Sequence, residues 1–164
     1  MKIGIIGNGF VGKSTYSMVN NKFNIVYIYD IDPLKSIPKN LNICKLRECD
    51  IIFICVPTPM KHSGECYLDI VKDVVNQLND IVDINFTSIV LRSTVPCGTS
   101  DYLNVSFMPE FLTEKNWKSD CYHCKNWIIG VNNDLVINKI KTILKDAKES
   151  NNILYDNLQV CYNR

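Results

Sequence analysis

Three glycines near the start of the chain most constrain its fold. The segment Gly7–Gly12 has the sequence GNGFVG, follows the apolar run Ile3–Ile6 directly and precedes a helix-like stretch that reaches about Asn20. In a G-x-G-x-x-G pattern the first glycine permits a tight turn, the second lets the backbone approach a pyrophosphate, and the third lets the helix pack on the strand. We therefore expect a phosphate-binding turn at the N-terminus of a helix. The residues expected to line it are Gly7, Gly9, Phe10, Val11 and Gly12.

A second apolar run, Asn24–Tyr29, ends in Asp30. In dinucleotide-binding folds an acidic residue roughly twenty positions after the glycines accepts hydrogen bonds from the ribose hydroxyls of NAD. The same carboxylate repels the additional phosphate of NADP. Strand, glycine loop, helix, second strand and terminal Asp30 together predict an NAD site.

The same residues allow a competing interpretation, because Gly7–Ser14 also matches the P-loop pattern G-x-x-x-x-G-K-S. A P-loop enzyme would place Lys13 on the phosphates and Ser14 on Mg²⁺, with a second acid at the end of a neighbouring strand. Asp30 is the only strand-terminal acid that could fill this role, and it lies closer in sequence to the loop than the role calls for. The strands at Ile51–Val56 and Ser88–Leu91 end without an acid. The simplest interpretation of Lys13 and Ser14 is a solvated first helical turn, and a P-loop NTPase or phosphotransferase remains the alternative.

The rest of the chain alternates apolar runs with helical periodicity. The further expected elements are strands at Asp50–Val56, Ser88–Leu91, Asn104–Met108 and Trp127–Val131, helices at Leu68–Val82 and Val136–Ala147 with Asp134 as N-cap, and a loop with at most a short helix at Ile31–Leu41. Continuous apolar strands are typical of a parallel sheet that is covered on both faces. We therefore predict a single α/β domain over residues 1–164, with the doubly wound, mostly parallel sheet of a Rossmann-type dinucleotide-binding domain.

Composition excludes several classes of function. The 164 residues carry 18 Lys and Arg against 17 Asp and Glu, a net charge of +1, so no general basic surface is available for nucleic acid. No apolar run approaches the roughly 18–20 residues that span a bilayer. We expect that Met1–Gly7 is not a signal peptide, because it is short and runs straight into the glycine loop. We expect a cytoplasmic protein whose eight cysteines are reduced. The pair Cys121 and Cys124 lacks a second ligand pair, so we predict loop thiols and no metal site.

Five segments together resemble one enzyme family. They are Gly7–Gly12, Tyr29–Asp32, Val56–Pro59, Ser93–Thr99 (STVPCGT) and Met108–Glu114 (MPEFLTE). Their order and spacing are similar to those of the N-terminal NAD-binding domain of the UDP-glucose/GDP-mannose dehydrogenase family, and the resemblance covers nearly the whole chain. It favours NAD over the P-loop interpretation.

The resemblance implies roles for individual residues along the cofactor. Asp30 would bind the adenosine ribose, and Lys35 would lie along the adenine or ribose edge. Thr58 and Thr94 would place hydroxyls beside the cofactor, while Glu114 would face the nicotinamide end. Because the carboxyl ends of parallel strands open onto one crevice, these side chains can converge on one ligand.

Two residues would also act in catalysis. Thr94 resembles the threonine beside the active-site water, and Glu110 resembles the glutamate that assists hydrolysis of a thioester intermediate. Without the family pattern, the two threonines Thr58 and Thr94 would be interpreted as turn caps beside prolines, and Glu110 as an exposed carboxylate.

The chain also departs from the family pattern. Family members oxidise the C6 alcohol of a nucleotide sugar twice through a cysteine thioester, and their nucleophilic cysteine, central helix and substrate domain lie beyond the position of Arg164. Lys115 stands where a glycine is usual, and neither Cys97 nor Cys161 is expected to replace the nucleophile. We therefore expect a monomeric, truncated UDP-glucose 6-dehydrogenase-like NAD-binding domain that does not complete the reaction alone. A separate substrate-domain protein is a candidate partner, and a non-catalytic Rossmann binding module is a further alternative.

Overall fold

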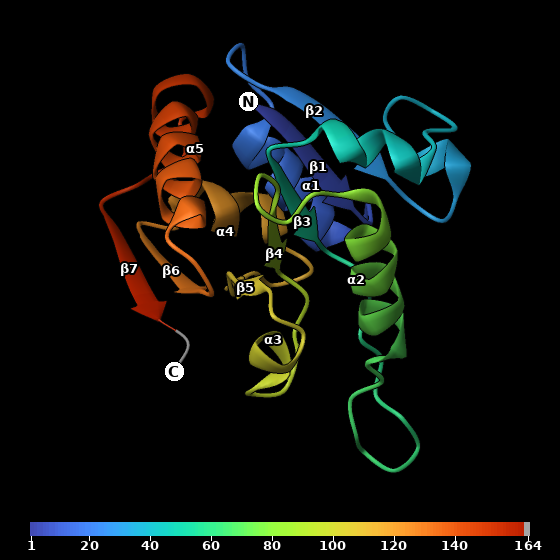
Figure 1. Cartoon of the computed structure of the whole chain (residues 1–164). Coiled ribbons are helices and arrows are strands. Elements are labelled where there is room, and N and C mark those ends of the chain that lie inside the picture. Colours follow the sequence, from blue (N-terminus) through green and yellow to red (C-terminus); the bar gives the residue numbers. More distant parts are fainter. Residues whose placement is uncertain (163–164) are drawn as a thin grey trace.

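A single sheet forms the centre of the computed structural model, which describes residues 1–162 (Figure 1). Its seven strands are β1 (Lys2–Ile6), β2 (Ile25–Tyr29), β3 (Ile51–Ile54), β4 (Ser88–Leu91), β5 (Ser106–Phe107), β6 (Asn126–Val131) and β7 (Asn157–Tyr162). The spatial order is β2-β1-β3-β4-β5-β6-β7. The first five strands are parallel, as predicted. β6 runs antiparallel to β5, and β7 then runs parallel to β6.

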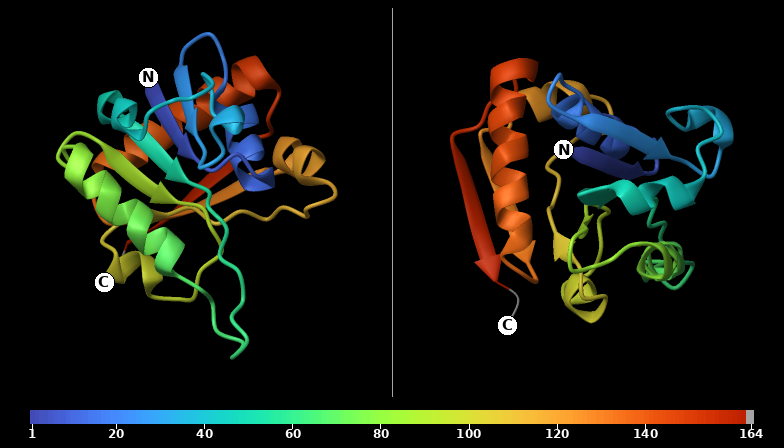
Figure 2. Two further views of the ribbon diagram at one scale, coloured as in Figure 1. Left: turned by 90° about the vertical axis from the view of Figure 1, so that its right-hand side faces the viewer. Right: turned by 45° about the horizontal axis from the view of Figure 1, so that its top comes forward.

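Helices cover both faces of this sheet. They are α1 (Phe10–Val19), α2 (Asp69–Ile81), α3 (Thr99–Tyr102), α4 (Trp117–His123) and α5 (Leu135–Asn151), with short 3-10 helices η1 (Pro33–Lys35) and η2 (Ile43–Glu48). α1, α4 and α5 pack on one face, and α2 and η2 on the other. In the left view of Figure 2, α2 lies in front of the sheet and α5 behind it. None of the helices in residues 1–162 is long and apolar enough to cross a membrane.

Alternation along the strands explains the two layers. In β3 the side chain of Phe53 joins the core beneath α1 and α5, while Ile52 and Ile54 join the core beneath α2. Side chains on successive residues of a strand point to opposite faces. A strand whose two faces are both buried therefore needs a continuous apolar run. β3 is such a strand, since all four of its residues are buried.

The predicted elements are mostly confirmed, with boundary shifts of up to four residues and two local errors. The Cys121–Cys124 segment is not a loop, because Cys121 lies in α4 and is only 1% exposed. Asp134 occupies the N-cap position of α5 but makes no side-chain cap; Asn133 Oδ1 instead accepts from the N–H of Leu135 at 3.1 Å. The elements that the sequence analysis missed are η2, α3, α4 and β7.

The strand order sets the place of the site. The chain moves outward from β1 to β2, then returns to pair β3 on the other side of β1. In open α/β sheets, ligands bind beyond the carboxyl ends of the strands at the point where the order reverses. The Gly7–Gly12 segment follows β1 at this point.

Candidate functional site

Two of the three glycines are required by the backbone itself. Gly7 has φ +94°, and a Cβ there would lie 2.6 Å from the carbonyl oxygen of Cys55. A Cβ on Gly12 would overlap the carbonyl oxygen of Gly7, so the helix approaches the strand closely there. At Gly9 an added Cβ would meet nothing within 4 Å. The first and third glycines therefore shape the turn, while the second leaves open space above it, which fits the approach of a pyrophosphate.

The N-terminus of α1 presents free backbone donors at this turn. No side chain caps the helix, and its first backbone bond runs from the N–H of Lys13 to the carbonyl of Gly9 at 2.9 Å. The N–H groups of Phe10, Val11 and Gly12 precede that bond and have no acceptor within the helix. Together with the helix dipole, they form a site suited to an anion.

Asp30 is tied to the glycine loop by hydrogen bonds. Its Oδ2 accepts from the N–H of Asn8 at 2.7 Å, and its Oδ1 accepts from the N–H of Asp32 at 2.9 Å. The Asn8 side chain donates to the carbonyl oxygen of Lys35 at 2.7 Å. Asn8, which the sequence analysis did not single out, thus holds the turn against the segment after β2. The Lys35 ammonium itself is exposed and lies 3.7 Å from the Asp32 carboxylate.

The structure brings together the two threonines that follow β3 and β4. Thr58 Oγ1 donates to the carbonyl oxygen of Thr94 at 2.7 Å. One residue earlier in the second loop, Ser93 Oγ donates to the carbonyl oxygen of Val56 at 2.7 Å. These bonds join the carboxyl ends of two neighbouring strands, so both threonines lie at the rim of the crevice.

The two predicted glutamates occupy different surroundings. Glu110 is half-buried, and its Oε2 accepts from the N–H of Leu112 at 2.8 Å. Glu114 is exposed at the end of the same loop. Glu110 also lines a small cavity together with Arg92, a residue that the sequence analysis passed over although it directly precedes Ser93-Thr94.

The P-loop interpretation does not fit the geometry of the turn. α1 already begins at Phe10, so the phosphate-wrapping loop that the P-loop pattern implies is absent and Lys13 lies within the helix. The Ser14 side chain, which would ligate Mg²⁺, is 1% exposed. Cys121 of α4 donates to the backbone carbonyl oxygen of Ser14 at 3.6 Å, so α4 covers this part of α1.

The buried cysteines are not activated nucleophiles. Burial raises the pKa of Cys55 to about 11 and that of Cys49 to about 12, and it also raises the pKa of Cys121. A thiol attacks as its thiolate, which these environments disfavour. In the part of the chain that the structure describes, no three His, Cys, Asp or Glu residues are grouped so that they could hold a metal ion.

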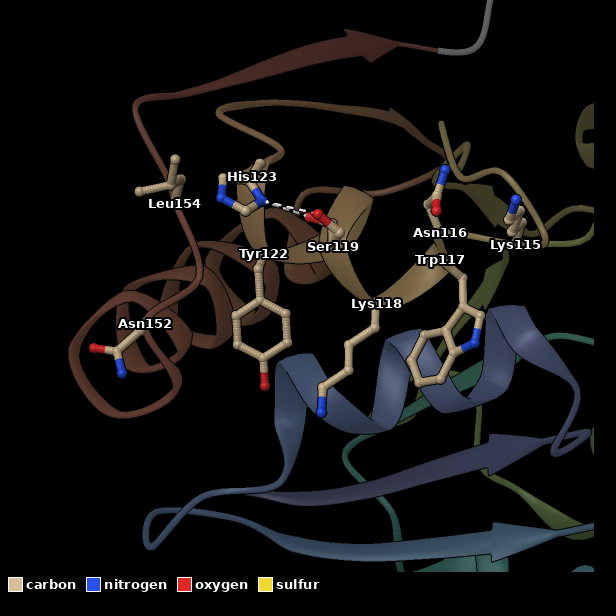
Figure 3. A pocket seen from close by; sticks show the side chains of 9 residues that line it. All are labelled: Lys115, Asn116, Trp117, Lys118, Ser119, Tyr122, His123, Asn152 and Leu154. Carbon is tan, nitrogen blue, oxygen red and sulfur yellow. Dashed lines mark hydrogen bonds between the residues drawn. The ribbon is translucent and has the colours of Figure 1, made fainter.

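A hollow of about 1010 Å³ lies away from the crevice, beside α4. Trp117, Lys118 and Tyr122 extend from α4 towards the side of α1 (Figure 3). His123 Nδ1 lies 2.8 Å from the carbonyl oxygen of Ser119 within the same helix. The hollow is wide and open, and the residues predicted as the site lie elsewhere.

The family is decided by a sequence comparison. The profile of the UDP-glucose/GDP-mannose dehydrogenase family, NAD binding domain, matches residues 37–148. The chain belongs to this family. It is thus an NAD-binding domain by descent, although the matched range begins after the glycine loop and Asp30. A role of those residues in cofactor binding is therefore a proposal, which their geometry supports.

Individual relatives agree with this family membership. The chain is similar to UDP-glucose 6-dehydrogenase YwqF of Bacillus subtilis, with 31% identity over 114 residues, which are 61% of this chain and 26% of the relative. It is also similar to the UDP-glucose 6-dehydrogenase of Rickettsia conorii, with 34% identity over 63% of this chain and 27% of the relative. The chain thus spans about a quarter of the length of these curated relatives.

Solved structures share the fold. GDP-mannose dehydrogenase of Pseudomonas aeruginosa matches with a TM-score of 0.77 at 19% identity, over 99% of this chain and 46% of that chain. UDP-D-ManNAc dehydrogenase of Pyrococcus horikoshii matches with a TM-score of 0.78 at 16% identity, over 99% of this chain and 47% of that chain. At identities this low, the similarity shows that the chain shares the arrangement of strands and helices with these structures.

Proposed function

We propose that the NAD-binding domain holds its cofactor at the carboxyl ends of β1, β2, β3 and β4. The open space at Gly9 and the free N–H groups of Phe10, Val11 and Gly12 would receive the pyrophosphate. Asp30 would accept the adenosine ribose hydroxyls, because each of its carboxylate oxygens accepts one backbone bond and retains a lone pair. The observation that carries this proposal is the juxtaposition of the uncapped helix, the open Gly9 and Asp30.

Four more residues would complete the cofactor site. Lys35 would lie along the adenine or ribose edge, since its backbone is fastened to the turn through Asn8. Thr58 and Thr94 would line the nicotinamide half, where their mutual hydrogen bond sets the rim of the crevice. Glu114, exposed in the loop that follows β5, would face the nicotinamide end.

We propose nucleotide-sugar oxidation as the reaction to which this domain contributes, with Thr94 and Glu110 positioning a water near the reacting carbon. NAD⁺ accepts a hydride from the alcohol carbon in such reactions. The 164 residues span about a quarter of the relatives that perform the reaction. The nucleophile and the groups that hold the sugar would be supplied from outside this stretch, and these residues alone would not complete the reaction.

Calorimetric titration of the purified chain tests the cofactor assignment. We expect saturable NAD⁺ binding that weakens at least tenfold in Asp30→Ala, which corresponds to about 1.4 kcal/mol. Mg-ATP is the control for the P-loop alternative and should not bind. A folded chain that binds neither nucleotide would contradict the proposal and favour a non-catalytic module. NADH formation from UDP-glucose by the chain alone would contradict the proposed division of roles.

A further inference from the structure

Arg92, at the carboxyl end of β4, is a buried ion without a partner in the described protein. Its side chain is 2% exposed, and its Nε and Nη1 atoms have no hydrogen-bond partner within residues 1–162. The guanidinium group lies over the Trp127 ring, 6.0 Å from the centroid. A buried charge is strongly unfavourable unless it is paired and hydrogen-bonded, so stacking on Trp127 alone does not account for this position.

A small cavity adjoins the guanidinium group. Its volume is about 10 Å³, and it lies between the end of β4, the loop after β5, α4 and β6. That volume matches a single water molecule, whose position requires roughly 10–15 Å³ and two to four polar partners. The unpaired Nε and Nη1 donors of Arg92, which lines the cavity, would supply two of these partners. The cavity is too small for an organic ligand.

Glu110 is the acidic residue on the cavity wall. The full lining consists of Arg92, Pro109, Glu110, Phe111, Leu112, Cys121, Cys124, Asn126, Trp127 and Ile128. Burial raises the pKa of both Cys121 and Cys124, so these thiols are neutral and do not balance the arginine. Glu110 engages Oε2 with the N–H of Leu112, which leaves Oε1 to face other donors. A carboxylate on the wall also disfavours a chloride ion in the cavity.

We propose that Arg92 is a positioning residue that holds the Glu110 carboxylate through one water molecule in this cavity. Arg92 and Glu110 are not within direct ion-pair distance in the described structure, so the water supplies the missing link between donor and acceptor. The inference rests on the proposed function, in which Glu110 acts on a water near the reacting carbon. Arg92 would fix the direction in which that carboxylate points, without contacting substrate or cofactor itself.

A double-mutant cycle on the cofactor-free chain tests the coupling. Glu110→Gln should lower the melting temperature by about 3 °C when it is introduced into the wild-type chain. When it is introduced into the Arg92→Met variant, it should lower the melting temperature by less than about 1 °C. Arg92→Lys should restore most of the dependence on Glu110, because it restores the cation. Equal losses in the wild type and Arg92→Met would overturn the proposal. Glu114→Gln, in the same loop but outside the cavity, is the control and should have the same effect in both backgrounds.

Two further readouts separate positioning from packing. The amide proton of Leu112 reports where Glu110 lies, so its NMR shift should change in Arg92→Met and return in Arg92→Lys. A crystal structure of the wild-type chain should show one water within hydrogen-bond distance of both Arg92 and Glu110. This measurement does not depend on whether any variant folds. An empty cavity, or a chloride ion in it, would contradict the proposal. None of these measurements uses NAD, so a failure of NAD⁺ binding in calorimetry would be a separate result.

Discussion

A single methyl group added at Gly9 should weaken cofactor binding while leaving the stability of the fold unchanged. Gly9 has φ −75°, which alanine adopts without strain, and its Cβ would meet nothing within 4 Å. We predict that Gly9→Ala folds with a stability within about 0.5 kcal/mol of the wild type. It should bind NAD⁺ at least tenfold more weakly in calorimetry, because the methyl group occupies the space proposed for the pyrophosphate.

Gly12→Ala is the matched comparison for that variant. Its Cβ would overlap the carbonyl oxygen of Gly7, and this backbone atom cannot move without shifting the turn. We expect a loss of roughly 1–3 kcal/mol in the free energy of unfolding, measured by urea titration. Wild-type NAD⁺ affinity in Gly9→Ala, or wild-type stability in Gly12→Ala, would contradict the roles given to these glycines.

Asn8 offers a second prediction at the residue scale. Asn8→Ala removes the side-chain bond to the Lys35 carbonyl while the backbone bond from residue 8 to Asp30 remains. The phosphate and ribose halves of the site should then be less rigidly held, and NAD⁺ affinity should fall by about threefold to tenfold, the worth of one hydrogen bond. Calorimetry checks this. Asn85→Ala, whose side chain bonds only within its own surface loop, should leave the affinity unchanged.

At the scale of elements, the antiparallel join between β5 and β6 depends on few contacts. The strands share one register pair, Phe107 with Gly130, and Ser106 Oγ donates to the Asn132 side chain at 2.8 Å. Ser106 is 1% exposed. Ser106→Ala should lower the free energy of unfolding by about 1–3 kcal/mol, since it leaves Asn132 without this partner. Urea denaturation measures the loss, and a change no larger than that of exposed Ser63→Ala would refute the prediction.

The whole molecule should lose stability in alkaline solution because of its buried thiols. Burial raises the pKa of Cys49 from 9.0 to about 12, so the folded state keeps a proton that the unfolded chain releases above pH 9. The contribution is fully present below pH 9 and is lost as the pH rises towards 12. Burial lowers the pKa of Lys139, so the contribution of this group to the free energy of unfolding rises with pH and opposes that of Cys49. Comparing the wild type with Cys49→Ala isolates the effect of the Cys49 thiol, because Lys139 is present in both proteins.

Between pH 8 and pH 10 the wild type should therefore lose about 1.4 kcal/mol more than Cys49→Ala. Urea denaturation of both proteins at each pH provides the comparison. Cys97→Ala, which replaces an exposed thiol, is the control and should follow the wild type. Parallel pH curves for the wild type and Cys49→Ala would contradict the assignment.

Local sequence patterns determined most of the parallel half of the fold and the cofactor end of the candidate site. Buried strands require continuous apolar runs, and the turn after β1 excludes side chains at Gly7 and Gly12, so both features are visible along the chain. The strand-terminal position of Asp30 follows from the same pattern. The short elements η2, α3 and α4 were missed because they span too few residues to show a helical period.

Tertiary structure alone decided which distant residues meet. The reversal of β6 depends on its contact with β5, and β7 shows only partial burial along an edge of the sheet, so neither has a local signal for its direction or place. Arg92 is an ordinary charged residue in the sequence, yet in the fold it is buried, its guanidinium group lies over the Trp127 ring, and it lines the same small cavity as Glu110. Local sequence determines conformations that depend on neighbouring residues. Burial and charge pairing depend on what the fold brings from elsewhere, which no single segment encodes.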